Sequence, residues 1–478
     1  MVDLVQLVQN NIMLLDIEQL ENQVTFSFFN EKGEVELKTY DTSSFPNWYT
    51  CEENDKRRNI HNVNWDGKPV KASFEKKISK HGLIEFIEKL PKEDSDLIFG
   101  YNFPKTYFFD IEVEVTEGFP EAERAASKIL TISVVTPNHQ VIVLGLKDCT
   151  EKEKQDIQNQ TNKYFEKFGI NWDIKYVKFN TEYDLVYTFI NKFMRKFPML
   201  SGWNCINFDW KYIVNRCKRL QINPADASPT GTLTRDGLPY HIGIVDYMDL
   251  YSNWDRSISV KENNQLNTAA MQSIGVGKIK YDGGLQQLYE DDYQKYLYYN
   301  AVDSILVYLI DQKLKTLQVV LTLSNICKIS FYKAGSPVAI TESLIARNLL
   351  AEGKVMSIKP YQKEREKSEQ YAGAYVKQPI TGKHKAVACF DFASLYPSIM
   401  RQFNISPDSF VEMVSPAKAE EFDKDTFTVT STGAVYEKDP SILKKVLTDL
   451  YAKRREYKKK MFEYKMQLEK ISEKLKEK

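Results

Sequence analysis

The stretch Phe108-Phe109-Asp110-Ile111-Glu112 decides the fold of the middle part of this 478-residue chain. Its apolar residues predict a buried strand, and its two carboxylates lie on one face of a sheet because side chains alternate along a strand. Two like charges side by side in apolar surroundings are costly unless a cation compensates them. The pair therefore predicts a divalent-metal site, although a solvated sheet edge is the commoner meaning of an isolated Asp-x-Glu pair.

Two later motifs carry carboxylates that could join this pair. The segment Gly202 to Asp209 places Asp209 at a strand-to-helix turn, and Tyr299-Asn300-Ala301-Val302-Asp303 places Tyr299 and Asp303 one turn apart on a helix face. A Tyr-x-x-x-Asp pair is usually incidental, but the order, spacing and apolar context of all three motifs favour one site. Oxygen ligands of this kind suit Mg²⁺ or Mn²⁺, and paired ions suit in-line phosphoryl displacement.

The patterns around these motifs predict a layered domain of strands and helices. Strands are expected at 107–115, 129–135, 141–144 and 199–203, and helices at 182–196, 210–220 and 291–317. Alternation over residues 20–40 predicts a β-hairpin that opens a separate α+β domain. The polar segment 361–370 is the best candidate for a linker.

Composition limits what the whole chain can be. Its length exceeds what one core usually holds, so several domains are expected, and its formal net charge of +0 leaves nucleic-acid binding to a local patch. Six scattered cysteines without a Cys-x-x-Cys pair argue against disulfides and zinc sites. No basic signal region and no membrane-length apolar run occurs, so we expect a reduced, cytoplasmic protein without membrane contact.

A further carboxylate lies in the segment Cys389 to Ser398. Its apolar residues predict a strand that delivers Asp391 and then turns through small and polar residues. Backbone N–H groups near Ser394 and Leu395 are suited to phosphate oxygens. A strand end with a capping aspartate is the alternative interpretation.

The chain from about Pro440 onward predicts one long, basic helix. Residues 444–478 contain 13 Lys or Arg and 6 Asp or Glu. Apolar residues recur within it at alternating steps of four and three, which is a heptad seam: Tyr457, Met461, Tyr464, Leu468, Ile471 and Leu475. A basic helix with an apolar stripe needs something to pack on.

The carboxylate motifs together resemble the DEDDy type of 3′→5′ exonuclease, the proofreading domain of family B DNA polymerases, and the segment Asp391 to Ser398 resembles that family's first palm motif. The resemblance is closest to replicative polymerases of T-even-like phages and covers essentially the whole chain. It implies that two Mg²⁺ or Mn²⁺ ions are held in the exonuclease by four residues, and that Tyr299 positions the attacking water. The four are Asp110, Glu112, Asp209 and Asp303.

The same resemblance implies roles in a polymerase site. Asp391 would bind metal ions, Ser394 and Leu395 would meet the triphosphate, and Tyr396 would lie under the sugar and exclude a 2′-hydroxyl. Arg454 and Lys458, one helical turn apart, match basic residues that the family aims at the incoming nucleotide. Without the resemblance, basic residues in so charged a helix would be interpreted as a solvated face.

Contacts with DNA are expected at two further places. Tyr371 and Gly373 lie in a Tyr-Ala-Gly-Ala segment that looks like the family's template-contacting element between exonuclease and palm. Lys278 and Lys280, near the Gly277-to-Gly283 turn, are candidates for phosphate contacts. Solvated loop lysines are the alternative for that pair.

The resemblance implies a multidomain α+β and α/β protein. The expected parts are an N-terminal β-rich domain at 1–104 with a return segment at 316–362, an RNase H-like 3′→5′ exonuclease at 105–315, the first part of a palm at 363–440, and the first fingers helix at 441–478.

Two motifs of the family are absent from the sequence: the Lys-x₃-Asn-Ser-x-Tyr-Gly motif of the returning fingers helix and the Asp-Thr-Asp motif with the second palm carboxylate. We therefore expect the N-terminal polypeptide of a split or truncated polymerase, in the host cytoplasm if phage-encoded. Its expected partners are primer-template and single-stranded DNA, deoxynucleoside triphosphates, a second polypeptide with the remaining fingers, palm and thumb, and a sliding clamp. A stand-alone exonuclease fragment and a non-polymerising RNA- or DNA-binding protein are the alternatives.

Overall fold

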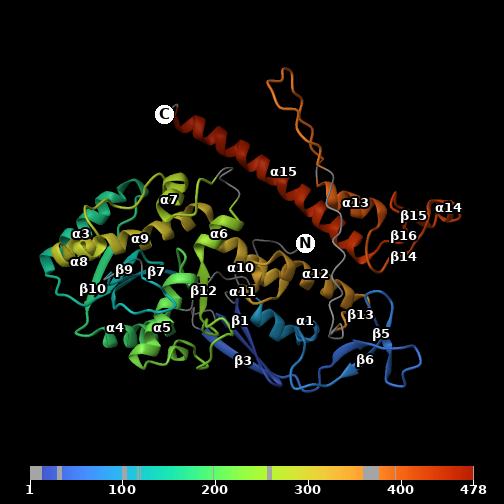
Figure 1. Cartoon of the computed structure of the whole chain (residues 1–478), viewed down its shortest axis with the longest axis horizontal. Helices are drawn as coiled ribbons and strands as arrows, with labels where there is room; N and C mark the ends of the chain where they lie inside the picture. Colours follow the sequence, from blue (N-terminus) through green and yellow to red (C-terminus); the bar gives the residue numbers. More distant parts are fainter. Residues whose placement is uncertain are drawn as a thin grey trace. The chain divides into compact units, whose positions relative to one another are not determined.

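The computed structural model describes residues 13–29, 35–99, 105–115, 118, 120–197, 199–255, 261–358, 376–392 and 394–476 (Figure 1). The chain divides into two compact units. The first contains Met1–Thr42 and Leu90–Ile340, and the second contains Ser43–Lys89 and Thr341–Lys478. Within the described ranges, no helix combines the length and apolar character that crossing a membrane requires.

The first unit opens with a three-stranded antiparallel sheet in the order β1-β2-β3. Its strands are β1 (Met13–Leu20), β2 (Gln23–Phe29) and β3 (Val35–Asp41). Val24, Phe26 and Phe28 alternate along β2 and are buried, which is the pattern that predicted the hairpin. The structure adds one strand in front of the predicted pair.

The larger sheet of the first unit has six strands in the order β10-β9-β8-β7-β11-β12. The antiparallel strands are β7 (Thr106–Val113), β8 (Ile129–Val135) and β9 (Gln140–Gly145), and the parallel additions are β10 (Asp173–Lys178) beside β9, β11 (Met199–Gly202) beside β7, and β12 (Gly243–Asp246) beside β11. The predicted strands are therefore all present, with bounds that shift by one or two residues.

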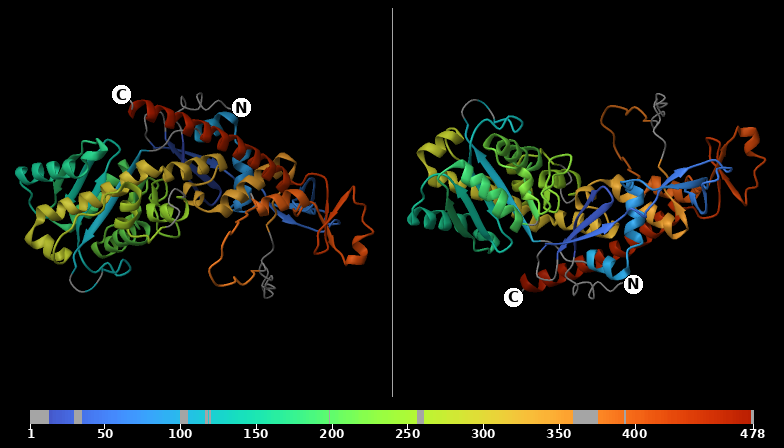
Figure 2. Two further views of the ribbon diagram at one scale, coloured as in Figure 1. Left: turned by 90° about the horizontal axis from the view of Figure 1, so that it is seen from above. Right: turned by 90° about the horizontal axis from the view of Figure 1, so that it is seen from below.

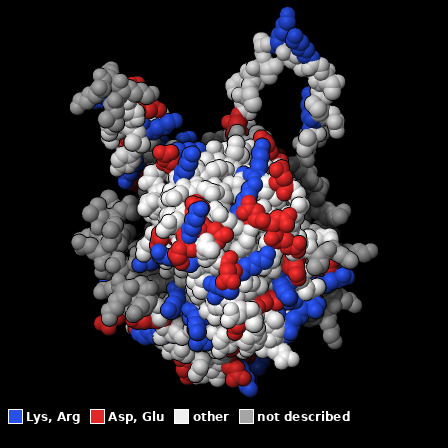
Figure 3. All heavy atoms as spheres, turned by 90° about the vertical axis from the view of Figure 1, so that its left-hand side faces the viewer, with Lys and Arg blue, Asp and Glu red and all other residues white. Residues whose placement is uncertain are grey.

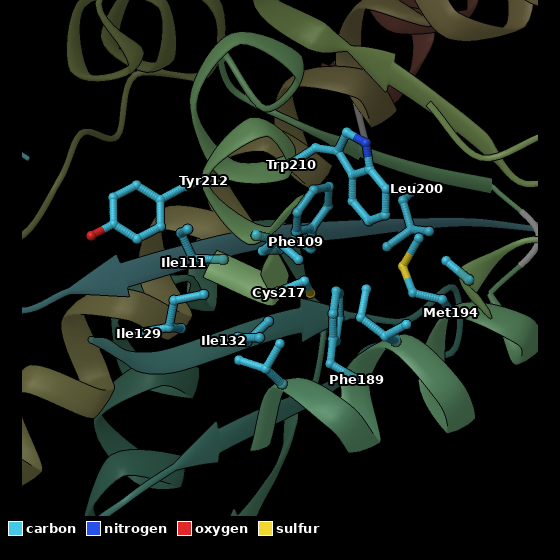
Figure 4. Packing of buried hydrophobic residues seen from close by; sticks show 14 of the residues in the cluster. Phe109, Ile111, Ile129, Ile132, Phe189, Met194, Leu200, Trp210, Tyr212 and Cys217 are labelled. Atoms are coloured by element: carbon cyan, nitrogen blue, oxygen red, sulfur yellow. The ribbon is translucent and has the colours of Figure 1, made fainter. Parts of the chain in front are cut away.

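Helices cover both faces of this sheet (Figure 2). On one face Phe109 and Ile111 of β7 join a core with Phe189 and Trp210 (Figure 4). On the other face the ring of Phe108 lies 5.7 Å from that of Tyr308 on α9 (Tyr293–Leu314). Because alternate residues of β7 face opposite ways, Asp110 and Glu112 lie on the α9 side with Phe108.

The remaining helices of the first unit connect these strands. They are α2 (Lys92–Ile98), α3 (Glu151–Tyr164), η2 (Glu166–Phe168), α4 (Glu182–Thr188), η3 (Phe189–Phe193), η4 (Met194–Lys196), η5 (Ile206–Trp210), α5 (Lys211–Leu220), η6 (Pro224–Ala227), α6 (Tyr247–Asn253), α7 (Leu266–Ile274), α8 (Leu285–Asp291), α10 (Thr316–Cys327) and α11 (Phe331–Ala334). Two of them, η3 and η5, are π-helical turns. The helix predicted over 182–196 is thus α4 continued by η3 and η4.

The second unit contains a small sheet in the order β13-β5-β6-β4. Its strands are β4 (Asn47–Thr50), β5 (Arg58–Asn64), β6 (Pro69–Ser73) and β13 (Lys354–Val355). β13 pairs with β5, and Ile358 just after it bridges to Tyr49 of β4. One short segment therefore pairs with both edges of the sheet and closes it into a ring around Trp48, Val70 and Val355.

The other elements of the second unit are α1 (Lys80–Glu88), α12 (Pro337–Ala351, which begins before the division), α13 (Leu395–Phe403), β14 (Phe410–Met413), α14 (Pro416–Ala419), β15 (Phe427–Val429), β16 (Ala434–Glu437) and α15 (Ile442–Lys476). The predicted terminal helix is α15. Five residues of its heptad seam are between 55% and 64% exposed: Tyr457, Met461, Tyr464, Leu468 and Ile471. We call these five the apolar seam; the side chain of Leu475 lies outside the described part.

The strand predicted just before Asp391 is wrong. Residues 376–392 form no strand, and Phe390 and Phe392 are 92% and 75% exposed. A strand must pair its backbone groups with neighbouring strands, and no described strand pairs with this segment. The predicted linker at 361–370 lies outside the described residues.

Candidate active site

Three of the predicted carboxylates meet between β7 and α9. Oxygen atoms of Asp110, Glu112 and Asp303 lie within 4.8 Å of one another. Asp303 is 2% exposed, and its Oδ1 accepts no hydrogen bond within the described part of the chain. Tyr299, one turn earlier on α9, is also buried. The convergence follows from the alternation of β7 and the helical spacing on α9.

The fourth predicted ligand, Asp209, is not one of these three clustered carboxylates but lies beside them on η5, the π turn after β11. Its Oδ1 accepts a hydrogen bond of 2.9 Å from the backbone N–H of Ile111, the residue between Asp110 and Glu112. Gly202 precedes this turn, and a Cβ there would lie 2.5 Å from the carbonyl oxygen of Phe109. Only glycine allows this close approach of β11 to β7.

Asp246, at the end of β12, holds the turn that carries Asp209. Its Oδ1 accepts from the N–H of Asn204 at 3.0 Å, and its Oδ2 from the N–H of Ile206 at 3.2 Å. Asn204 has a φ of 59° in the left-handed region, which asparagine tolerates better than most residues. Asp246 could not be selected from its sequence context, because the turn that it holds lies about 40 residues away in the chain.

Lys278 places a positive charge in the site. Its Nζ donates to Asp303 Oδ2 at 2.7 Å and to the Tyr299 hydroxyl at 3.0 Å. Its own backbone N–H donates to Asn267 Oδ1 at 2.8 Å, which fixes the loop. Lys278 is therefore an ion-pair partner of Asp303, whereas Lys280 is exposed. The solvated-loop alternative therefore does not apply to Lys278.

Burial and mutual repulsion raise the proton affinity of the carboxylates. Burial, then the charges of Asp209, Glu112 and Asp303, holds the pKa of Asp110 well above its ordinary value. Burial and the Asp303 charge raise the pKa of Glu112 to about 8, and burial raises that of Asp209 to about 7. Burial also raises the pKa of Asp303, against the attraction of Lys278.

These residues fit divalent cations. Buried, unprotonated carboxylates need compensating positive charge, one lysine faces four of them, and the buried Oδ1 of Asp303 is without a donor. Oxygen-only ligand sets suit Mg²⁺ or Mn²⁺. On the face of the molecule that Figure 3 shows, Lys and Arg are interspersed with Asp and Glu, so this face offers no broad positive field.

The candidate polymerase residues belong to the second unit and are far more exposed. Asp391 is exposed and precedes α13, and Tyr396 on α13 is 74% exposed. The Arg454 guanidinium of α15 donates to the Ser394 hydroxyl at 2.9 Å. Leu395 begins α13, and Lys458 is exposed on α15. Tyr371 and Gly373 lie outside the described residues.

Comparison with known protein families matches two segments. Residues 44–239 match the family described as DNA polymerase family B, exonuclease domain, and residues 331–474 match DNA polymerase family B. Tyr299 and Asp303 lie between the two matched segments.

Curated relatives come from phages and from other sources. The chain is 27% identical over 386 residues to the DNA-directed DNA polymerase of Escherichia phage RB69, covering 73% of this chain and 41% of the relative. It is 30% identical over 318 residues to that of Enterobacteria phage T4, covering 62% and 35%. It is 27% identical over 406 residues to the DNA polymerase of Archaeoglobus fulgidus, covering 82% and 44%.

The chain spans between 35% and 44% of the length of these three relatives. The two matched segments and the phage relatives agree with the motifs at Asp110 and Asp391. The chain belongs to DNA polymerase family B and carries an exonuclease domain and part of a polymerase domain of that family.

Proposed function

We propose that this chain is a 3′→5′ exonuclease that removes nucleotides from single-stranded DNA ends with two divalent ions. The carboxylate cluster of β7 and α9, with Asp209 of η5 bonded to the backbone beside it, carries the proposal. Each cut would add water across a phosphodiester bond, releasing a nucleoside 5′-monophosphate and leaving a 3′-hydroxyl on the shortened strand.

The proposed roles follow from position. Asp110, Glu112, Asp209 and Asp303 would hold the ions, which supply a nucleophile from water near neutral pH and stabilise charge on the leaving oxygen. The Tyr299 hydroxyl, 3.0 Å from Lys278 Nζ, would orient the attacking water. Lys278 balances the negative charge of Asp303. It would also contact a phosphate oxygen of the bound DNA.

Degradation of a 5′-labelled single-stranded oligonucleotide in Mg²⁺ tests this function. The expected products are a ladder that shortens from the 3′ end, and a blocked 3′ end should stop it. Asp110→Ala should abolish the ladder, and Asp391→Asn, which changes an exposed carboxylate of the other unit, should leave it intact. DNA binding without a ladder would favour a non-catalytic nucleic-acid-binding protein.

We also propose that the second unit contributes to a polymerase site for primer-template DNA and deoxynucleoside triphosphates. The hydrogen bond between Arg454 and Ser394 supports this, because it joins two residues proposed to meet one triphosphate. Asp391 would bind metal there, with Leu395, Tyr396 and Lys458 at the nucleotide. The proposed domain boundaries remain 104/105, 315/316, 362/363 and 440/441.

A second polypeptide with the remaining fingers, palm and thumb is proposed to complete that site, and a sliding clamp is a further proposed partner. The apolar seam of α15 supports the second polypeptide, since exposed apolar patches of this kind commonly mark interaction surfaces. Tyr371, Gly373 and Lys280 remain proposed DNA contacts. Primer extension with and without a polypeptide carrying the two absent motifs tests this arrangement; no extension and no co-elution would contradict it.

A further inference from the structure

Asn300 is a polar residue buried inside the first unit, next to Tyr299 on α9. It is 0% exposed, and its side-chain amide donates a hydrogen bond of 2.9 Å to Asp110 Oδ2. Its own Oδ1 is buried without a hydrogen-bond donor among the described residues. A buried amide that leaves its acceptor unsatisfied is costly. An amide at this position therefore does not satisfy its own hydrogen-bonding groups, and its hydrogen bond to Asp110 is the better reason for its presence.

The surroundings of Asp110 show why an amide matters there. The charges of Asp209, Glu112 and Asp303 repel its negative form, and Lys278 bonds to Asp303 rather than to Asp110. Among the described residues, Asn300 is the one side chain that donates a hydrogen bond to Asp110. The amide holds the Oδ2 atom of Asp110 in place. It gives a donor without adding a positive charge that would compete with a cation.

A structural role is the alternative, because α9 is also docked on β8 through polar groups. The Ser133 hydroxyl donates to the Asn300 carbonyl oxygen at 3.0 Å and lies 2.5 Å from the Ser304 hydroxyl. Ser304 is 0% exposed, like Asn300, but it has no bond to a carboxylate of the site. Ser304 is therefore the matched control for helix docking.

We propose that Asn300 is a positioning residue that holds Asp110 in the orientation needed to bind a divalent ion. The inference rests on the proposed exonuclease function, but it concerns ion binding and can be tested without cleavage. Neighbours that orient metal ligands typically change affinity by about 10–100-fold when they are replaced.

The test is titration of the full chain with Mn²⁺, following free Mn²⁺ by electron paramagnetic resonance in the absence of DNA. Asn300→Leu keeps the side-chain size and removes the donor, so the dissociation constant should rise by about tenfold. Asn300→Ser, whose hydroxyl is too short to reach Asp110, should give the same rise if the leucine variant does not fold. Ser304→Ala should leave the affinity within about twofold of the unmodified chain while lowering its melting temperature.

Nuclease assays add a second readout. At saturating Mn²⁺ the leucine variant should recover most of its turnover, because the defect lies in ion binding. Equal affinities for all variants, or an equal loss in Ser304→Ala, would overturn the assignment and leave Asn300 a docking residue. A chain that binds Mn²⁺ but cleaves no DNA would refute the exonuclease proposal alone, and the affinities would still decide the role of Asn300.

Discussion

The two carboxylate sites differ in how much of their surroundings the described residues supply. In the exonuclease site, β7 and α9 bring together the half-buried Asp110 and the buried Glu112 and Asp303 with Lys278, and η5 adds the buried Asp209, which bonds to the backbone of Ile111. At the palm motif, one exposed carboxylate precedes α13, and its segment pairs with no described strand. Three short motifs thus gave a preorganised site, whereas the longest motif in the sequence did not. A motif becomes a site when its structural neighbours are present.

The largest expected effect is on exonuclease turnover, when the carboxylate of Asp303 is replaced. Asp303→Asn removes a charge shared by the metal cluster and Lys278, so exonuclease turnover should fall on the order of 1,000-fold, as several kcal/mol of transition-state stabilisation are lost. Single-turnover cleavage of labelled single-stranded DNA measures this. A comparable fall in Asp391→Asn would break the distinction.

The lysine is the next test. Lys278→Met leaves the buried Asp303 without its hydrogen-bonded cation, so turnover should fall by about 10–100-fold and the metal-free protein should lose stability. Lys280→Met, an exposed change two residues away, should alter turnover by less than about twofold at physiological salt. Cleavage rates and melting curves in EDTA decide it. Equal effects of the two variants would show that Lys278 acts as a general DNA contact.

The pH dependence of stability should distinguish the buried cluster from the exposed palm carboxylate. Folding raises the pKa of Glu112 to about 8 and that of Asp209 to about 7, so the folded state binds more protons than the unfolded state. The contribution of these two carboxyl groups to the stability of the fold is therefore present at low pH and is lost as pH rises towards these values. In EDTA the melting temperature should therefore fall by roughly 5 °C between pH 6 and pH 8.5.

Adding Mg²⁺ should remove most of that fall, since cations compensate the ionised carboxylates. Differential scanning calorimetry at several pH values measures both curves. Glu112→Gln should flatten the EDTA curve, and Asp391→Asn should not. A metal-free protein that gains stability with rising pH through this range would contradict the assigned shifts.

The smallest expected effect concerns α15. Leu468 is 64% exposed, so Leu468→Glu should change the stability of the chain by no more than about 0.5 kcal/mol and leave exonuclease turnover unchanged. Association with a completing polypeptide should be lost, because a charge enters the apolar seam. Lys459→Glu, at an exposed position away from the seam, is the control for added negative charge. Co-elution on a sizing column provides the readout.

Much of the exonuclease domain could be predicted because its apolar residues recur with the periods of strands and helices. β8 has the expected bounds, and β7 and α9 differ from expectation by a few residues at their ends. The π turns η3 and η5 were not predicted, since the residues on either side keep an ordinary helical pattern. Asn300 and Asp246 were missed because a hydrogen-bond partner distant in sequence leaves no periodic trace. The available signal for Asn300 was its amide side chain in the middle of a helix whose residues are buried over more than four turns.

The strand predicted before Asp391 was wrong because its signal was local composition alone. Its residues have the composition of a strand, but a strand is a property of a pair, and its partners are not among the described strands. The exposure of Phe390 and Phe392 is the consequence.

The ring in the second unit constrains the order in which this protein can fold. β4, β5 and β6 are complete by Ser73, but the segment that closes them is Lys354 to Ile358. During synthesis at about 5–20 residues per second, that closing segment emerges roughly 15–60 s later. Most of the nuclease unit is translated in between and can fold first. The small sheet must wait with open edges, and unpaired strand edges are liable to aggregate during that time.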